Sequence, residues 1–222
     1  MYKPNILIEL YRIAHNQFPW QRGITRDTIL RYFKIFGTAD FDPILRTRTG
    51  LSASELYTIG MALSGHFSVD FMLDLPAQVK DFQVTVEQID QFLMLFSADV
   101  PTLRADASKN QSYDQDYEYV FNPLRKFPLV RIARNADIIS VAAPLPTFLM
   151  RRFTEGVYYE LLDAKGFSEA FGKSFQTYTG DVLSVSNSQR RLNILPECPF
   201  DVGRDRKDSV DWIVRTKQPI CS

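Results

Sequence analysis

The sequence predicts an α+β protein, and three observations support this prediction. Amphipathic segments with helix-capping residues fill the first half of the chain. The apolar period then shortens to that of a β-hairpin within residues 127–141. Two long helical patterns and two apolar strand segments follow. We therefore expect a mainly helical N-terminal half, a hairpin, two long helices and an incomplete α/β core.

The composition is that of a globular protein without a dominant charge. The 222-residue chain is 45% hydrophobic, and its 26 basic residues balance 26 acidic residues, so no global field attracts nucleic acid or a membrane surface. No apolar run reaches the ~18 residues that span a bilayer, and Glu9 and Arg12 interrupt the N-terminal apolar pattern. We expect a cytoplasmic protein with no membrane partner.

Two helices are expected in the first forty residues. Residues 5–16 carry apolar side chains at helical spacing. A second helix, 25–36, begins at Thr25, whose hydroxyl can cap it, and ends before Gly37, because glycine favours the position after a helix. The segment around Asp42 is expected to be a loop.

Two further helices are predicted by capping boxes, in which residues three positions apart satisfy each other's backbone N–H groups. Ser52 and Glu55 have this spacing ahead of an apolar stripe, which predicts a helix over 52–64. Thr85 and Gln88 repeat the spacing ahead of a fourth helix. The chain is therefore expected to be mostly helical through residue 106.

A polar segment is the expected boundary between two domains. Residues 107–119 have no hydrophobic period, so we expect a loop there. It separates a helical domain, 1–106, from a second domain, 117–222. In the second domain the residues 134–137 form the turn of the hairpin, and a long helix is expected over 146–163.

The C-terminal region ends in a strand that begins with a charge. We expect a helix over 167–184, a strand near 191–195, a loop over 198–209 and a strand centred on 211–214. Asp211 opens this last strand. A charge beside buried apolar residues is costly unless it is paired, and a metal ion is one such partner.

Two sequence patterns carry a resemblance to a known family. The pattern FG…FQ-x-Y-x-G at 171–180 and the pattern DSVDWIV at 208–214 resemble uncharacterised bacterial proteins that end in a nuclease-like domain of the PD-(D/E)xK, or restriction-endonuclease-like, superfamily. The resemblance implies Mg²⁺-dependent DNA cleavage, in which clustered carboxylates hold Mg²⁺ and activate water. It implies a catalytic and metal-binding role for Asp211, and it places Gln176 where a metal-binding Glu is expected.

Two departures from the family pattern bear on activity. Gln176 is neutral, which weakens it as a metal ligand, and no E-x-K follows Asp211. The resemblance therefore implies a chain that is truncated before the E-x-K strand and is catalytically incompetent. The strand at Ile213 and Val214 would keep an unpaired edge, and exposed edges recruit another chain, so self-association is expected there.

Basic residues near the predicted site are candidates for contacts with DNA phosphates. They are Arg190, Arg191, Arg204, Arg206 and Lys207. Acidic residues interleave with them, so a solvated loop of mixed charge is the alternative. Asp211 likewise has an alternative role as a strand-end residue that accepts hydrogen bonds from loop amides, and Gln176 one as a solvated helix residue.

The competing class is a non-enzymatic interaction or DNA-binding protein. The helices 5–16, 25–36 and 52–64, followed by the hairpin 127–141, have the order of a winged-helix unit. The third helix carries no Arg, Lys, Asn or Gln with which to read base edges. The winged-helix alternative is therefore supported by the order of elements alone.

Overall fold

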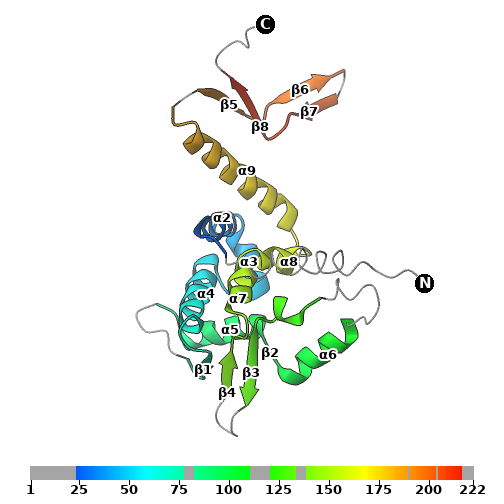
Figure 1. The fold of residues 1–222 in the computed structure, drawn as a ribbon. Helices are drawn as coiled ribbons and strands as arrows, with labels where there is room; N and C mark the ends of the chain where they lie inside the picture. The colour runs from blue at the N-terminus through cyan, green and yellow to red at the C-terminus, as the bar shows by residue number, and fades with distance from the viewer. Residues whose placement is uncertain are drawn as a thin grey trace, which may run out of the picture. The chain divides into compact units, whose positions relative to one another are not determined.

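The computed structural model describes residues 24–77, 83–110, 121–133, 139–189, 191–203 and 205–216. The protein has an α+β fold that divides into two compact units, Met1–Phe167 and Ser168–Ser222 (Figure 1). The predicted helix over 5–16 lies outside the described residues. Within the described ranges, no helix is long and apolar enough to cross a membrane.

The first two described helices have their ends set by local sequence. α2 (Arg26–Phe36) begins at Thr25, whose hydroxyl oxygen accepts a backbone hydrogen bond, and ends at Gly37, as predicted. α3 (Asp42–Thr49) replaces the predicted loop. Its Pro43 lies in the first turn of the helix, where a missing N–H leaves no hydrogen bond unmade. The proline therefore starts a helix here.

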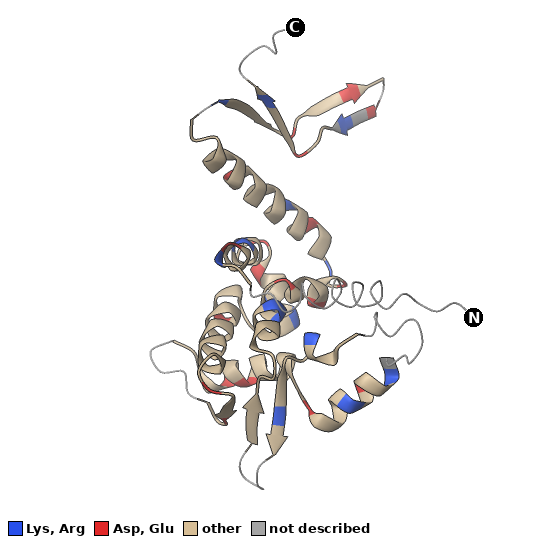
Figure 2. Cartoon of the chain, in the orientation of Figure 1, with Lys and Arg blue, Asp and Glu red and all other residues tan. Residues whose placement is uncertain are grey.

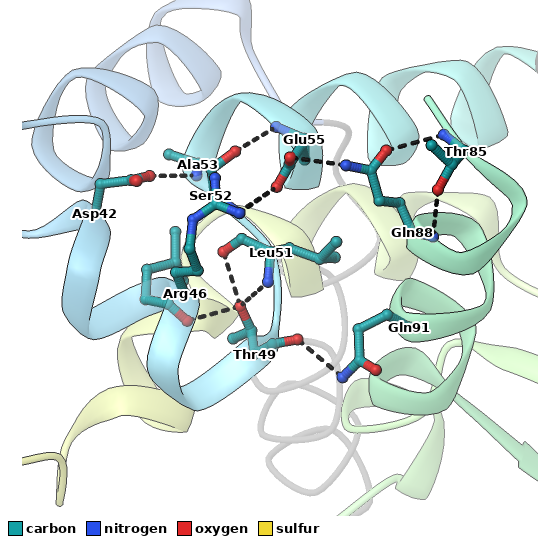
Figure 3. A network of polar contacts seen from close by, with 11 residues as sticks. Asp42, Arg46, Thr49, Leu51, Ser52, Ala53, Glu55, Thr85, Gln88 and Gln91 are labelled. Atoms are coloured by element: carbon teal, nitrogen blue, oxygen red, sulfur yellow. Dashed lines mark hydrogen bonds and ion pairs between the residues drawn. The ribbon is translucent and has the colours of Figure 1, made fainter. Parts of the chain in front are cut away.

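α4 (Ala53–Phe67) and α5 (Val86–Phe96) begin at the two predicted capping boxes, both of which are formed. The boxes are also joined to each other. Glu55 Oε2 accepts a hydrogen bond from the Ser52 N–H at 2.7 Å, and Glu55 Oε1 accepts one from Gln88 Nε2 at 2.7 Å (Figure 3). One carboxylate therefore connects the N-termini of α4 and α5.

The charge of Glu55 is stabilised by this arrangement. Burial acts to raise the pKa of Glu55, but the capping hydrogen bonds, the Arg46 guanidinium 3.4 Å away and the Gln88 amide outweigh it, so the pKa lies below its ordinary value. Gln91 Nε2 also donates to the backbone carbonyl of Thr49 at 3.0 Å (Figure 3). Polar side chains thereby fix α3, α4 and α5 against one another.

A four-stranded mixed sheet has the order β1-β4-β3-β2. β3 (Leu129–Ala133) and β4 (Ile139–Ala142) are antiparallel, which confirms the predicted hairpin, although its turn lies outside the described residues. β1 (Met72–Asp74) pairs antiparallel with β4, and β2 (Ser97–Asp99) pairs parallel with β3. Both outer strands were absent from the sequence prediction, because three residues are too few to show a period.

The strand pairing crosses the predicted domain boundary at residues 107–119. Leu73 lies opposite Val141, and Ala98 lies opposite Val130, so strands before residue 106 pair with strands after residue 117. Backbone hydrogen bonds across the predicted boundary hold both sides in one unit. The observed division comes after Phe167 instead.

The helix predicted over 146–163 is two shorter helices, α7 (Pro146–Phe153) and α8 (Gly156–Leu161). Thr154 ends the first one with non-helical backbone angles, φ −103° and ψ −98°. The Thr154 hydroxyl donates to the Met150 carbonyl oxygen at 2.6 Å. This carbonyl therefore has a side-chain hydrogen-bond donor at the end of the helix. The apolar period continues across this break and therefore concealed it.

α6 (Val100–Asn110) follows β2 directly and extends the helical structure into the segment predicted as a loop. A short 3₁₀ helix, η2 (Pro123–Arg125), leads into β3. The core of the unit lies where α4 and α7 pack, at Gly60 and Phe153. Its largest fully buried aromatic side chains are those of Phe36, Phe41, Phe92, Phe96 and Phe153.

The C-terminal unit contains most of α9 (Phe167–Ser186), which confirms the predicted helix. β5 (Leu192–Pro196) and β8 (Trp212–Thr216) confirm the two predicted strands and pair antiparallel in a two-stranded ribbon. The predicted loop between them is a hairpin, β6 (Pro199–Val202) and β7 (Asp205–Asp208). The charged residues of this hairpin gave no apolar period, so the sequence did not predict its strands.

Candidate functional site

Trp212, the first residue of β8, packs on α9. Its indole Nε1–H donates to the backbone carbonyl of Gln176 at 3.0 Å. A Cβ atom added to Gly180 would lie 2.2 Å from Cζ2 of this indole, closer than nonbonded atoms approach, so only glycine fits beneath the ring. Gln176 and Gly180 are four positions apart and share one helix face. These three residues, here called the tryptophan joint, connect α9 to the β5–β8 ribbon.

The side chain of Gln176 makes a second connection to the ribbon. Its Nε2 donates to Glu197 Oε2 at 3.1 Å, and the Glu197 N–H donates to the Asp211 carbonyl oxygen at 2.9 Å. The two residues singled out by the resemblance therefore both lie next to Glu197. Sequence analysis missed Glu197, for which the signal was a carboxylate directly after the apolar run of β5.

The predicted site residues have different environments. Gln176 is half-buried, so it is more than a solvated helix residue. Asp211 is exposed, and its main-chain carbonyl oxygen accepts the hydrogen bond from the Glu197 N–H. The alternative role expected for Asp211, in which the carboxylate binds loop amides, is not among the contacts of the described residues.

These residues do not fit a Mg²⁺ site. Mg²⁺ needs octahedral oxygen ligands at about 2.0–2.1 Å. Gln176 instead turns its amide nitrogen toward the Glu197 carboxylate. Over the described ranges, no three His, Cys, Asp or Glu side chains are grouped so that they could hold a metal. The metal and catalytic roles of Asp211, and the metal role of Gln176, stay predictions from the resemblance.

A shallow hollow of about 420 Å³ lies at the tryptophan joint. Besides the residues of the joint, its wall includes Asp181 and Ser184 of α9 and Pro196 of β5. Among the described residues, the lining holds one carboxylate, that of Asp181, and no histidine or cysteine.

The structure describes the side chains of two of the five predicted basic residues. Arg191 and Lys207 are exposed. Arg190 and Arg204 lie outside the described residues, and Arg206 is described only as a backbone position of β7. Charges of both signs lie on α9 and on the β6–β7 hairpin (Figure 2). Phosphate binding by these residues therefore stays a prediction.

Within the described part of the chain, the β5–β8 ribbon has an open strand edge. β8 pairs with β5 along one edge, and among the described residues no strand pairs along the other edge. No described residue of either strand is buried. The tryptophan joint holds one end of β8, while Val214 in its centre is exposed.

Comparisons of this chain with protein-family models, with curated proteins and with solved structures found no match. The nuclease-like resemblance is therefore carried by the two residue patterns alone. Both patterns take part in the tryptophan joint and its contacts with Glu197.

Proposed function

We propose that this chain is a non-catalytic interaction protein that self-associates through the open edge of β8. One observation carries the proposal: the ribbon has two strands, and β8 has a partner on one side within the described residues. Two-stranded ribbons are marginally stable in water, and a third strand or a packing surface stabilises them. A second copy of β8 would supply that strand.

The sequence of β8 is suited to this pairing. Its centre, Ile213 and Val214, is β-branched and apolar, as is typical of β-strands. In an antiparallel pair of two β8 strands centred on Val214, Arg215 of one copy would face Ile213 of the other. No two like charges would then lie directly opposite each other, which would otherwise oppose pairing.

In this proposal, the C-terminal unit descends from a nuclease-like domain. We take the order of helix and strands to be that of a nuclease-like domain whose parent activity is Mg²⁺-dependent DNA cleavage. In this chain Gln176 would serve the tryptophan joint, and Asp211 would begin the pairing strand. The hydrogen bond from Gln176 to Glu197 supports this reassignment, because it uses a side chain that a metal site would need.

The test is the mass of the full chain in solution, measured by light scattering across a concentration series. The wild type should form a dimer, and V214K should shift it to monomer, because an edge lysine blocks strand addition. V69K makes the same change at an exposed valine of the N-terminal unit and should leave the dimer intact.

A wild-type chain that is monomeric at all concentrations would contradict self-association. So would a dimer that V214K and V69K leave equally unchanged. The non-catalytic part of the proposal has a separate readout in a DNA-cleavage assay with added Mg²⁺. Cleavage by the wild type that D211A abolishes would show that the chain is an active nuclease.

A further inference from the structure

A cavity of about 760 Å³ lies within the N-terminal unit and has no role in the proposed function. η2, α7 and α8 form most of its wall, and Tyr32 of α2 completes it. Pockets for small molecules have volumes of roughly 300–1,000 Å³. The cavity is therefore large enough for a small-molecule ligand.

The lining carries an excess of positive charge. Its four basic residues come from η2, from the residue after it and from α7, while two glutamates come from α8 and the turn before it. They are Arg125, Lys126, Arg151 and Arg152, with Glu155 and Glu160. The excess is local, because the whole chain is neutral by the same count. A local basic excess around a concave site favours an anionic ligand.

Arg152 lies in the cavity wall and is held there by three hydrogen bonds. It is buried, and its guanidinium donates to the Lys126 carbonyl at 3.0 Å, the Gly156 carbonyl at 2.8 Å and Glu160 Oε2 at 2.6 Å. These bonds tie the end of η2 to α7 and α8. Arg152 therefore positions the neighbouring side chains, and Glu160 already neutralises its charge.

Arg125 and Arg151 bring like charges close together. Burial lowers the pKa of Arg125, and the neighbouring Arg151 guanidinium lowers it further. Glu155 Oε1 accepts a hydrogen bond from Arg151 Nη1 at 2.7 Å, so part of this repulsion is already offset. An anion next to both guanidinium groups would offset more of it, and phosphate matches their planar geometry.

Aromatic side chains line the same cavity as the basic ones. The lining includes Tyr32, Phe121, Phe148, Tyr158 and Tyr159. Phe148 is buried and forms part of the wall, whereas Phe121 is 44% exposed and Tyr159 is 73% exposed. Large exposed aromatic rings beside arginines are suited to stacking on a flat ring of a ligand, as they stack on nucleic-acid bases.

We propose that this cavity binds a nucleotide, with its phosphates at Arg125 and Arg151 and its base against Tyr159 and Phe121. The ligand class combines the two chemistries that the lining offers, which are an anion site and exposed aromatic faces. The proposal concerns the N-terminal unit alone. It stands whether or not β8 mediates self-association.

Calorimetric titration of the full chain with ADP, adenosine and inorganic phosphate tests the proposal. ADP should bind at least tenfold more tightly than either of the other two, because it alone engages both halves of the cavity. R125Q should weaken ADP binding at least tenfold. K165Q removes an exposed charge of the same unit outside the cavity and should leave ADP binding unchanged.

Y159A removes a ring proposed to contact the base and should not disturb folding, because Tyr159 is largely exposed. It should weaken ADP binding several-fold and leave the affinity for inorganic phosphate unchanged. Absence of ADP binding by the wild type would overturn the proposal. Equal affinities for ADP and inorganic phosphate would also overturn it, as would ADP binding that neither R125Q nor Y159A alters.

Discussion

Each of the two units contains a helical glycine packed beneath an aromatic ring, but the rings are buried to different extents. In the N-terminal unit, a Cβ atom on Gly60 would lie 2.6 Å from the Phe153 ring, and Phe153 is fully buried among other core residues. In the C-terminal unit, Trp212 covers Gly180 but is itself only half-buried. Close packing of one pair therefore makes a core only where further apolar layers cover it.

The largest expected effect is the loss of the buried ring in the N-terminal unit. F153A should lower the free energy of unfolding by about 3–5 kcal/mol, because it removes a large side chain and leaves a cavity. Phe200 of the C-terminal hairpin is 47% exposed, and F200A should change stability by less than about 1 kcal/mol. Urea unfolding followed by circular dichroism measures both. Similar losses for the two variants would contradict the difference between the units.

A smaller effect is expected at the tryptophan joint. G180A should destabilise the attachment of the ribbon by about 1–3 kcal/mol, because the new methyl group overlaps the Trp212 ring. G172A, elsewhere in α9, has open space around its new methyl group and should be neutral or stabilising by up to about 1 kcal/mol. Tryptophan fluorescence in a W20F background reports on the joint during unfolding. Equal behaviour of both variants would mean that the joint is not closely packed.

The smallest effect concerns the polar network around Glu55. The pKa of Glu55 in the folded state lies below its ordinary value of 4.5, so its contribution to stability is full above the unfolded-state pKa. That contribution is lost as the pH falls through the folded-state pKa. E55Q should therefore cost about 1 kcal/mol at pH 7, and the difference from wild type should shrink toward pH 3.

D90N is the control for this network, because Asp90 is an exposed carboxylate on α5. It should alter stability by less than about 0.5 kcal/mol. Unfolding by urea at several pH values measures both variants. A difference between E55Q and wild type that stays constant from pH 7 to pH 3 would contradict the role of the Glu55 charge.

The helix starts that the sequence predicted correctly have local causes. Thr25, and the Ser52 and Thr85 capping boxes, fix helix starts through contacts within four residues, so the pattern alone is sufficient. β1 and β2 have no such local cause, because each is a strand only through its pairing with β4 or β3. The polar segment 107–119 predicted a domain boundary. Strands on both sides of it pair with each other, and such long-range pairing leaves no local pattern in the sequence.

The sequence patterns also led to residues that lie together in the candidate site. Gln176 and Asp211 both contact Glu197, and their metal-binding roles stay predictions. The cavity beside η2 was missed entirely. Its walls come from segments that are distant in sequence, and Arg125 and Arg151 carry no spacing that marks them as neighbours.

The sheet order also constrains how the protein is made. β1 and β2 leave the ribosome before their partners, since β4 ends only at Ala142. Until then the emerging chain holds two short strands without neighbours, and unpaired strands in nascent chains are prone to wrong contacts. The polar contacts around Glu55 join residues 49–91 alone, so all of their groups are present during this interval. We therefore expect the sheet of the N-terminal unit to close after these contacts can form.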